Sequence, residues 1–174
     1  KSLAFGNGST LITTDKYGQV RDLYFPYVGL ENHIGGHYRH KIGVWVDGQF
    51  SWTDDNSWIV DTRSDGAYTG LTSLYSARLG VERHFTDVLF NEKNIFVRKV
   101  KVQNRRDEER EIRVFFNHQY EIYHSENLDT AFYDPMTNTV IHYEGRRAFL
   151  MNALMDGHGF NDYTVGIFEI EGKE

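Results

Sequence analysis

Residues 84–102 read HFTDVLF-NEKN-IFVRKVKV, two runs rich in apolar residues on either side of a polar turn. The first run spans His84–Phe90 and the second spans Ile95–Val102, with Asn91–Asn94 between them. Runs rich in β-branched and aromatic residues that alternate with charged ones are typical of paired strands. The alternation shifts near Arg98, which predicts a β-bulge there. The stretch therefore predicts a long antiparallel hairpin.

Turn residues separate similar strand-like runs along the rest of the chain. Asp47-Gly48, a strong short hairpin signal, joins Ile42–Val46 to Gln49–Trp52. Further expected strands are Leu11–Thr14, Val20–Tyr24, Trp58–Thr62, Leu71–Leu79, Glu111–Tyr123, Ala131–Tyr133, Thr139–Tyr143, Arg147–Leu154 and Tyr163–Ile170. Roughly ten to thirteen short strands with almost no helical periodicity predict an all-β fold, an antiparallel sandwich.

The composition agrees with this fold class and excludes several functions. Val, Ile and Thr together number 35 against six Ala, and aromatic residues make up 15% of the chain. The net charge of −6 has the wrong sign for binding nucleic acid or an anionic membrane. No cysteine is present, which excludes disulfides and cysteine-based zinc or redox sites. No apolar run approaches the ~20 residues that span a bilayer, and no signal-peptide pattern opens the chain.

The length bounds the domain organisation. A β-sandwich domain often needs about 200–250 residues, whereas this chain has 174 and stops inside the strand-like run Thr164–Ile170. We therefore expect residues 1–174 to form one β-sandwich domain from a longer protein.

The most unusual stretch joins two predicted hairpins, where residues 25–40 read FPYVGLENHIGGHYRH. Loops that combine stiff aromatic rings with polar groups commonly bind ligands. His33, His37 and His40 have the spacing of zinc ligands on one helix face. Gly35-Gly36 breaks that helix, and no His-Glu-x-x-His pattern accompanies it. The sequence therefore favours a structural or partner-contacting loop over a metal site.

Acidic residues give no catalytic assignment. Glycoside hydrolysis needs two carboxylates about 5–9.5 Å apart across a sugar. Four acidic residues fall in predicted loops, where each is more typical of a turn or cap: Glu31, Asp129, Asp134 and Asp162. No Gly-x-Ser-x-Gly elbow and no phosphate-binding glycine loop is present. We therefore predict no catalytic residue, no metal site and no cofactor in this chain.

The aromatic residues have two interpretations. Most are expected in the core of the sandwich, because alternating rings on strands usually pack inward. An exposed minority can stack on the apolar faces of sugar rings, and the candidates are Tyr27, Tyr38, Trp52 and Trp58.

Two separated stretches resemble glycoside hydrolase family 15. The first, Leu3–Ser9 followed by Tyr17–His33, resembles the N-terminal domain of prokaryotic glucoamylases and glucodextranases. The second, Asp129–Pro135 followed by Ile141–Arg147, is similar to the same family. The resemblance implies a large antiparallel β-supersandwich, similar to the galactose mutarotase-like fold, placed before an (α/α)6 barrel.

The resemblance also implies that the catalytic residues lie in a different domain. In that family the two catalytic glutamates, general acid and general base for inverting hydrolysis of α-glucosidic bonds, lie in the helical barrel, so no residue here inherits a catalytic role. The implied partners are the (α/α)6 catalytic domain of the same polypeptide and an α-glucan or maltooligosaccharide. The residues expected to contact that domain or carbohydrate are Phe25, Tyr27, Glu31, Asn32, His33 and Tyr38.

Two further function classes stay open. A freestanding carbohydrate-binding module would bind glucan through exposed rings, which calorimetric titration with maltooligosaccharides would detect. A mutarotase or epimerase would use a histidine acid and a glutamate base, which polarimetry with fresh α-glucose would detect.

Overall fold

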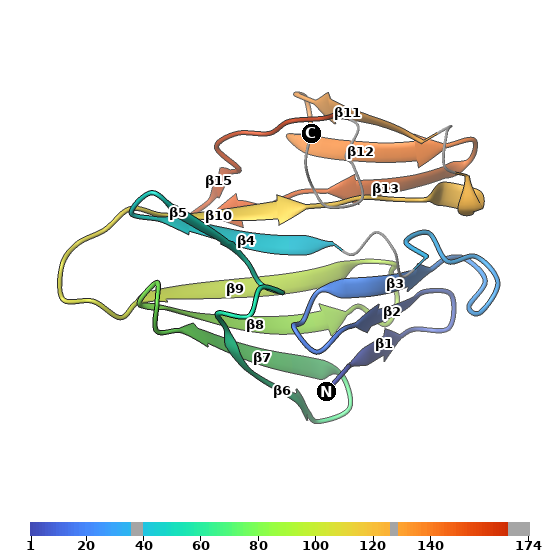
Figure 1. The fold of residues 1–174 in the computed structure, drawn as a ribbon. Helices are drawn as coiled ribbons and strands as arrows, with labels where there is room; N and C mark the ends of the chain where they lie inside the picture. The colour runs from blue at the N-terminus through green and yellow to red at the C-terminus, as the bar shows by residue number, and fades with distance from the viewer. Residues whose placement is uncertain (36–39, 126–128, 167–174) are drawn as a thin grey trace.

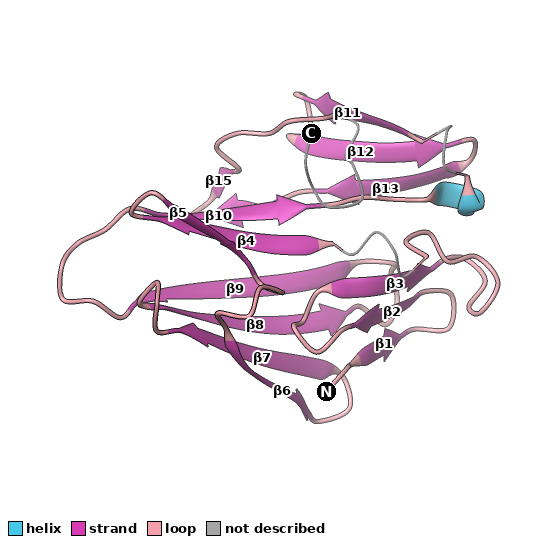
Figure 2. Ribbon diagram, in the orientation of Figure 1, coloured by secondary structure: helices cyan, strands magenta, loops and turns pink. Residues whose placement is uncertain are grey.

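The computed structural model describes residues 1–35, 40–125 and 129–166. Within these ranges, fifteen strands form antiparallel sheets and the helical structure is limited to a single 3-10 turn (Figure 2). The all-β antiparallel fold expected from the sequence is therefore confirmed.

The strands form five sheets. The order β1-β2-β3 joins Ala4–Gly6, Leu11–Thr14 and Val20–Tyr24. The order β10-β4-β5 joins Ile112–Asn117, Lys41–Val46 and Gln49–Trp52. The order β6-β7-β8-β9 joins Ile59–Asp65, Thr69–Ser76, Val81–Leu89 and Phe96–Asn104. The order β11-β12-β13 joins Thr130–Asp134, Thr139–Glu144 and Arg147–Met151. Finally, β14 (Leu154–Met155) pairs with β15 (His158–Gly159), and the 3-10 turn η1 spans Ile122–His124.

The first core lies between two of these sheets. Alternate residues of β4 point toward β7 and β8 because successive side chains of a strand face opposite sides. The buried members of this core are Ile42, Val44, Val46, Trp58, Leu74, Leu79, Val81 and Phe85. Each fully buried aliphatic or aromatic side chain contributes about 1.5–3 kcal/mol, so this core fixes the packing of β10-β4-β5 on β6-β7-β8-β9 (Figure 1).

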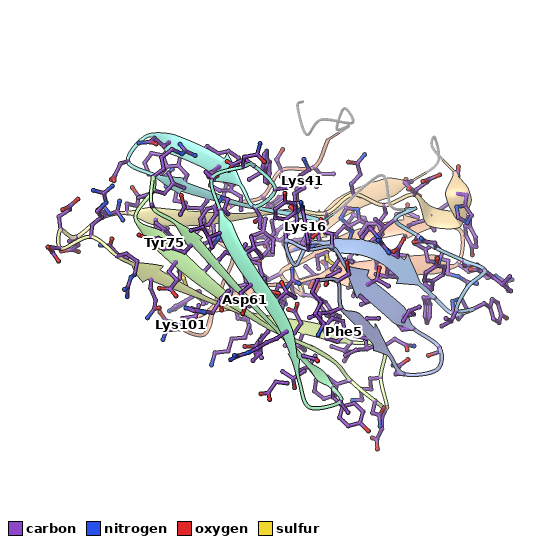
Figure 3. The ribbon with its side chains drawn as sticks, turned by 60° about the horizontal axis from the view of Figure 1, so that its bottom comes forward. Phe5, Lys16, Lys41, Asp61, Tyr75 and Lys101 are labelled. Carbon is purple, nitrogen blue, oxygen red and sulfur yellow. The ribbon has the colours of Figure 1, made fainter. Side chains whose placement is uncertain are left out.

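The opposite face of the four-stranded sheet is polar along much of its length. The register places Asp61 of β6, Ser73 of β7, His84 of β8 and Lys101 of β9 in one row across the sheet. Tyr75 lies on the same face, and Figure 3 labels it with Asp61 and Lys101. This alternation is the pattern of a sheet with one buried face.

The second core lies under β1-β2-β3 and continues into β13. Its buried members are Leu3, Phe5, Ile12, Val20, Leu23, Ile34, Leu89, Tyr120 and Ile122, with Phe149 and Met151 packed against them. Residues from segments more than 100 positions apart meet here, and this is the core that supports the segment between β3 and β4.

The prediction of a β-bulge near Arg98 is wrong. The pairing of β8 with β9 runs without a shift from Val81 opposite Asn104 to Leu89 opposite Phe96. Arg98 faces inward like its apolar neighbours, because two of its guanidinium nitrogens donate to the Asp87 carboxylate at 2.6 Å. Because a charged residue occupies this inward position, the alternation of apolar and charged residues looked shifted in the sequence although the strand pairing is regular.

Strand boundaries differ from the expectation at several places. The strand expected over Glu111–Tyr123 ends at Asn117, and the one expected over Leu71–Leu79 ends at Ser76. Of the run Tyr163–Ile170, residues 163–166 are not a strand, and residues 167–170 lie outside the described residues.

The charge run at residues 105–110 lies in an exposed loop, except for its last residue. The Arg110 guanidinium is almost buried and donates to the carbonyl oxygens of Leu79 and Gly80 at 2.9 and 2.8 Å. It also donates to Asn104 Oδ1 at 2.6 Å, so this arginine ties the loop to the sheet.

Candidate functional site

The segment Phe25–His33, called here the 25–33 loop, folds back on itself at the end of β3. The Phe25 N–H donates to the Glu31 carbonyl at 3.1 Å, and Tyr24 forms a bridge with Asn32. The Leu30 and Glu31 N–H groups both donate to the Tyr27 carbonyl, at 3.1 and 3.2 Å. The peptide bond between Phe25 and Pro26 is cis. The loop is thus a closed backbone turn rather than an open strand connection.

Asn32 fastens the base of the loop. Its Oδ1 accepts hydrogen bonds from the N–H groups of Leu23, Ile34 and Gly35, each at 3.2 Å. Its Nδ2 donates to the Asp22 carboxylate at 2.9 Å. One side chain therefore accepts from three backbone donors, two of which belong to the buried residues Leu23 and Ile34.

His33 lies inside the protein and links the loop to η1. Its side chain is completely buried, and its Nε2 lies 2.5 Å from the Phe25 carbonyl oxygen. The Tyr123 N–H donates to His33 Nδ1 at 3.4 Å. These contacts assign the neutral tautomer with the proton on Nε2, because Nδ1 accepts and Nε2 faces an acceptor. Burial also lowers the pKa of His33 below its ordinary value, so the ring is neutral at pH 7.

An ion pair joins the loop to β13. Arg147 Nε and Nη2 donate to Glu31 Oε2 at 3.0 and 2.9 Å, and Nη2 also reaches Oε1 at 3.2 Å. Both side chains are less than one quarter exposed. A two-pronged arginine–carboxylate contact fixes direction as well as distance. It connects residues 116 positions apart, one from each stretch that carries the family resemblance.

Three apolar side chains project from this base. Tyr27, Val28 and Leu30 are 57%, 44% and 76% exposed. We call these three residues the loop tip. The tip is held on a base whose polar groups bond within the chain, so the part of the loop that is available to a partner is apolar.

The expected site residues therefore separate into two groups. Tyr27 is at the surface, whereas Asn32 and His33 are buried and Phe25 packs its ring edge against Phe149 at 6.3 Å. Glu31 is partly exposed but bound to Arg147. Tyr38 lies outside the described residues.

The three-histidine spacing does not form a helix face. His33 and His40 each place Nε2 beside a backbone carbonyl, that of Phe25 and that of Gln119 at 3.2 Å, while His37 lies outside the described residues. Across the described ranges no group of three or more histidine or acidic side chains is placed to hold a metal ion.

His40 is buried and instead belongs to a cluster with the partly buried rings of His118 and His142. Its ring lies 4.8 Å from those of His118 and Tyr120, and Tyr120 contacts His142 at 4.7 Å. Burial lowers the pKa of His118 to about 3 and that of His142 to about 4. Burial likewise puts the pKa of His40 well below its ordinary value. These rings are neutral packing groups at pH 7.

The loop carboxylates act as turn and cap acceptors. Asp134 accepts from the Met136 N–H at 3.1 Å, Asp162 accepts from the Tyr163 N–H at 2.8 Å, and Asp129 accepts from the Ile122 N–H at 3.0 Å. This matches the structural interpretation given to them from sequence.

Trp58 is not an exposed ring, contrary to its place among the candidate stacking residues. It is buried, its Nε1 donates to Ser51 Oγ at 2.9 Å, and the Arg83 guanidinium lies 3.9 Å above its ring. Trp52 is half-buried and packs against Phe50 at 4.8 Å. Tyr27 is thus the candidate ring that the structure places most clearly at the surface.

The sequence missed Arg147 and Tyr123, the residues that hold the loop from outside it. Arg147 lies within the second resembling stretch, but nothing in its spacing connects it to Glu31. The first stretch likewise contains Asn7, whose Nδ2 donates to the carbonyls of Phe90 and Lys93 at 2.9 and 3.2 Å. These contacts join segments of the fold that are far apart in the sequence.

A second surface feature lies far from the loop along the chain. A shallow apolar hollow of about 240 Å³ is lined by Tyr68, Val88, Leu89, Phe90 and Asn91. Its lining contains no histidine, carboxylate or cysteine, so it offers no acid–base group or nucleophile of those types.

No helix long and apolar enough to cross a membrane occurs among the residues with assigned structure.

Comparisons with known proteins give a distant relation. No family model and no solved structure matches the chain. A curated protein of Methanocaldococcus jannaschii, the "Uncharacterized glycosyl hydrolase MJ1610", is 26% identical over 138 residues, which cover 78% of this chain. The matched region spans 20% of that protein's length. The chain is thus similar to one part of a longer protein described as a glycosyl hydrolase.

Proposed function

We propose that this chain is the non-catalytic N-terminal β-sandwich domain of a glycoside hydrolase that acts on α-glucosidic bonds, with the loop tip contacting the catalytic domain. The observation that carries the proposal is the construction of the 25–33 loop. The polar side chains of Glu31, Asn32 and His33 bond within the chain, whereas Tyr27, Val28 and Leu30 are presented to the outside. The relation to a longer glycosyl hydrolase supports the enzyme class.

The charge state of the loop indicates what kind of surface on a neighbouring domain would bind it. Glu31 is neutralised by Arg147, and His33 is neutral and buried. The tip therefore presents two aliphatic side chains and one phenol, and the acidic residue of the same loop is paired. Such a surface fits an apolar hollow on a neighbouring domain, because apolar area removed from water contributes about 25 cal/mol per Å².

Rigidity adds to this argument. Segments that are already ordered lose less conformational entropy when they dock. The backbone bonds inside the loop, the Asn32 acceptor and the ion pair to β13 order the tip before any partner arrives. This construction is that of a docking element rather than of an acid–base site.

The test uses the longer polypeptide with maltooligosaccharides as substrate. Tyr27→Ala and Leu30→Ala should lower turnover without changing the unfolding midpoint, because both side chains are mainly solvent-exposed in the isolated domain. The matched control is Tyr68→Ala, since Tyr68 is 71% exposed but lies on the β6–β7 turn. Turnover equal to wild type in both tip variants would end the proposal.

Direct carbohydrate contact by the same tip is a second candidate. The 57% exposed ring of Tyr27 supports it, because an exposed aromatic face can pack on a sugar ring. Calorimetric titration of the 174-residue chain with maltooligosaccharides at millimolar concentration separates the candidates. Heat that disappears in Tyr27→Ala indicates sugar binding, whereas no heat leaves the domain contact as the role of the tip.

A further inference from the structure

The sheet β10-β4-β5 carries aromatic rings on the face that points away from the first core. Four rings share this face, and we call them the aromatic platform: Trp45, Phe50, Trp52 and Phe115. The register aligns Phe115, Gly43 and Trp52 in one row across the three strands, and Trp45 with Phe50 in the next row. Phe50 and Phe115 are 42% and 43% exposed. The outward face of an antiparallel sheet is usually polar, so an aromatic one indicates an interaction surface.

Gly43 lets the rings of the platform pack together. A Cβ atom at this position would overlap the Phe50 ring and would lie 3.0 Å from Trp52 Cε3. The Phe50 ring contacts the rings of Trp52 and Phe115, at centroid distances of 4.8 and 5.6 Å and interplanar angles of 86° and 74°. Edge-to-face contacts of this kind are favourable. The glycine therefore allows Phe50 to lie close over the sheet and to join the two rows into one aromatic surface.

Two ion pairs border the platform. Arg113 Nε donates to Glu111 Oε1 at 2.7 Å, and the Arg113 guanidinium lies 4.8 Å from the centre of the Trp45 ring. On the other side, Lys41 Nζ lies 3.4 Å from Asp54 Oδ2, and Figure 3 labels Lys41 at this sheet. In each pair one cation meets one carboxylate. These two pairs therefore add no net charge to the border of the platform.

This combination of groups indicates the kind of ligand. Aromatic rings can pack on the apolar face of a pyranose ring, and the charged groups at the border can donate to and accept from its hydroxyl groups. A protein partner would have to cover the ion pairs, and removing paired charges from water is costly. A charged ligand would gain little from a border whose charges are already paired. The surface therefore fits a neutral saccharide better than a protein domain or a charged polymer.

We propose that the aromatic platform binds a neutral oligosaccharide, namely an α-glucan, at a site separate from the 25–33 loop. The pyranose rings pack on Phe50, Trp52 and Phe115, and the hydroxyl groups bond at the border. Binding there holds the chain on a glucan without any chemistry in this domain. The choice of an α-glucan rests on the proposed function, whereas the preference for a neutral saccharide rests on the platform itself.

Calorimetric titration of the 174-residue chain with maltohexaose tests this site. The wild type should bind the sugar at millimolar concentration. Phe115→Ala should weaken binding about fivefold to tenfold, because one ring contact is lost. Phe115→Tyr keeps the ring and should bind like the wild type. Tyr27→Ala is the matched control, since Tyr27 is exposed on the loop tip and should leave this affinity unchanged.

Phe50→Ala gives the same test if Phe115→Ala does not fold, because the two rings are almost equally exposed. Cellohexaose is titrated in parallel, and binding of cellohexaose alone would support the platform while contradicting the α-glucosidic specificity of the proposed function. The platform site would be overturned by absence of heat with both sugars, by unchanged affinity in the folded alanine variants, or by heat that disappears only in Tyr27→Ala. Since the titration uses the isolated chain, failure of the domain contact leaves its result unaffected.

Discussion

Replacing Asn32 with alanine should destabilise the protein more than its small size suggests. The substitution removes one acceptor that serves the N–H groups of Leu23, Ile34 and Gly35. A buried donor left without a partner costs about 1–3 kcal/mol. Since each bond is 3.2 Å long, we take the lower part of that range for each donor. The expected loss in the free energy of unfolding is then about 3–4 kcal/mol.

Urea unfolding followed by tryptophan fluorescence measures this loss. With an m-value of about 2 kcal/mol per molar, the midpoint should fall by about 1.5–2 M. A shift that corresponds to less than about 1 kcal/mol would refute the view that Asn32 alone satisfies these donors.

Exchanging the amide and the carboxylate between positions 32 and 22 tests the hydrogen bond that joins them. Asn32→Asp keeps the acceptor but places a second carboxylate 2.9 Å from Asp22, where the amide now donates. Combining it with Asp22→Asn restores one amide and one carboxylate in exchanged positions. The double variant should therefore be more stable than Asn32→Asp alone, by about 1–2 kcal/mol. A double variant no better than the single one would contradict the assigned hydrogen bond.

Two further predictions concern buried titratable groups. The stability of the chain should fall as pH drops from 6.5 toward 3, because the lowered pKa values of His118 and His142 mean that protons bind preferentially to the unfolded chain. The free energy of unfolding from urea titrations should fall by more than about 3 kcal/mol over this range. His142→Phe should flatten this pH profile, and an unchanged slope would show that His142 does not cause the loss. Arg83→Met should leave stability unchanged or raise it by about 1 kcal/mol, because the completely buried Arg83 leaves Nε and Nη1 without a partner in the described part of the chain. A thermal midpoint lowered by several degrees would show that the guanidinium contact with Trp58 stabilises the fold.

Local pattern was enough to predict the hairpins. Asp47 and Gly48 both have positive φ, as the sequence requires of that tight turn, and β4 and β5 pair across them. Such signals involve only a few neighbouring residues, so they can be recognised without knowledge of the tertiary structure.

The contacts that build the loop could not be predicted in the same way. Glu31 and Arg147 are 116 positions apart, and His33 and Tyr123 are 90 apart. Their pairing depends on how three sheets pack, which alternation along one strand does not encode. Arg98 misled for a related reason: its charge looked like a shift in the alternation, whereas the fold pairs it with the buried Asp87 carboxylate.

The composition of the 25–33 loop marked it as an unusual segment. The sequence did not distinguish its buried supporting residues from its exposed ones. Two polar residues of the motif, Asn32 and His33, are buried and support the loop, whereas the exposed tip is apolar. A ligand-binding interpretation gives most weight to polar side chains, but here those of Asn32 and His33 bond to groups within or next to the loop.

Amide hydrogen exchange of residues 27–30 tests the central claim most directly. The Val28 and Gly29 amides should exchange rapidly in the isolated 174-residue chain and much more slowly in the longer polypeptide, because the tip is expected to dock there. Tyr68, exposed on the β6–β7 turn, supplies the internal reference, since its amide should exchange alike in both. Equal exchange of the tip in the two proteins would contradict the domain contact.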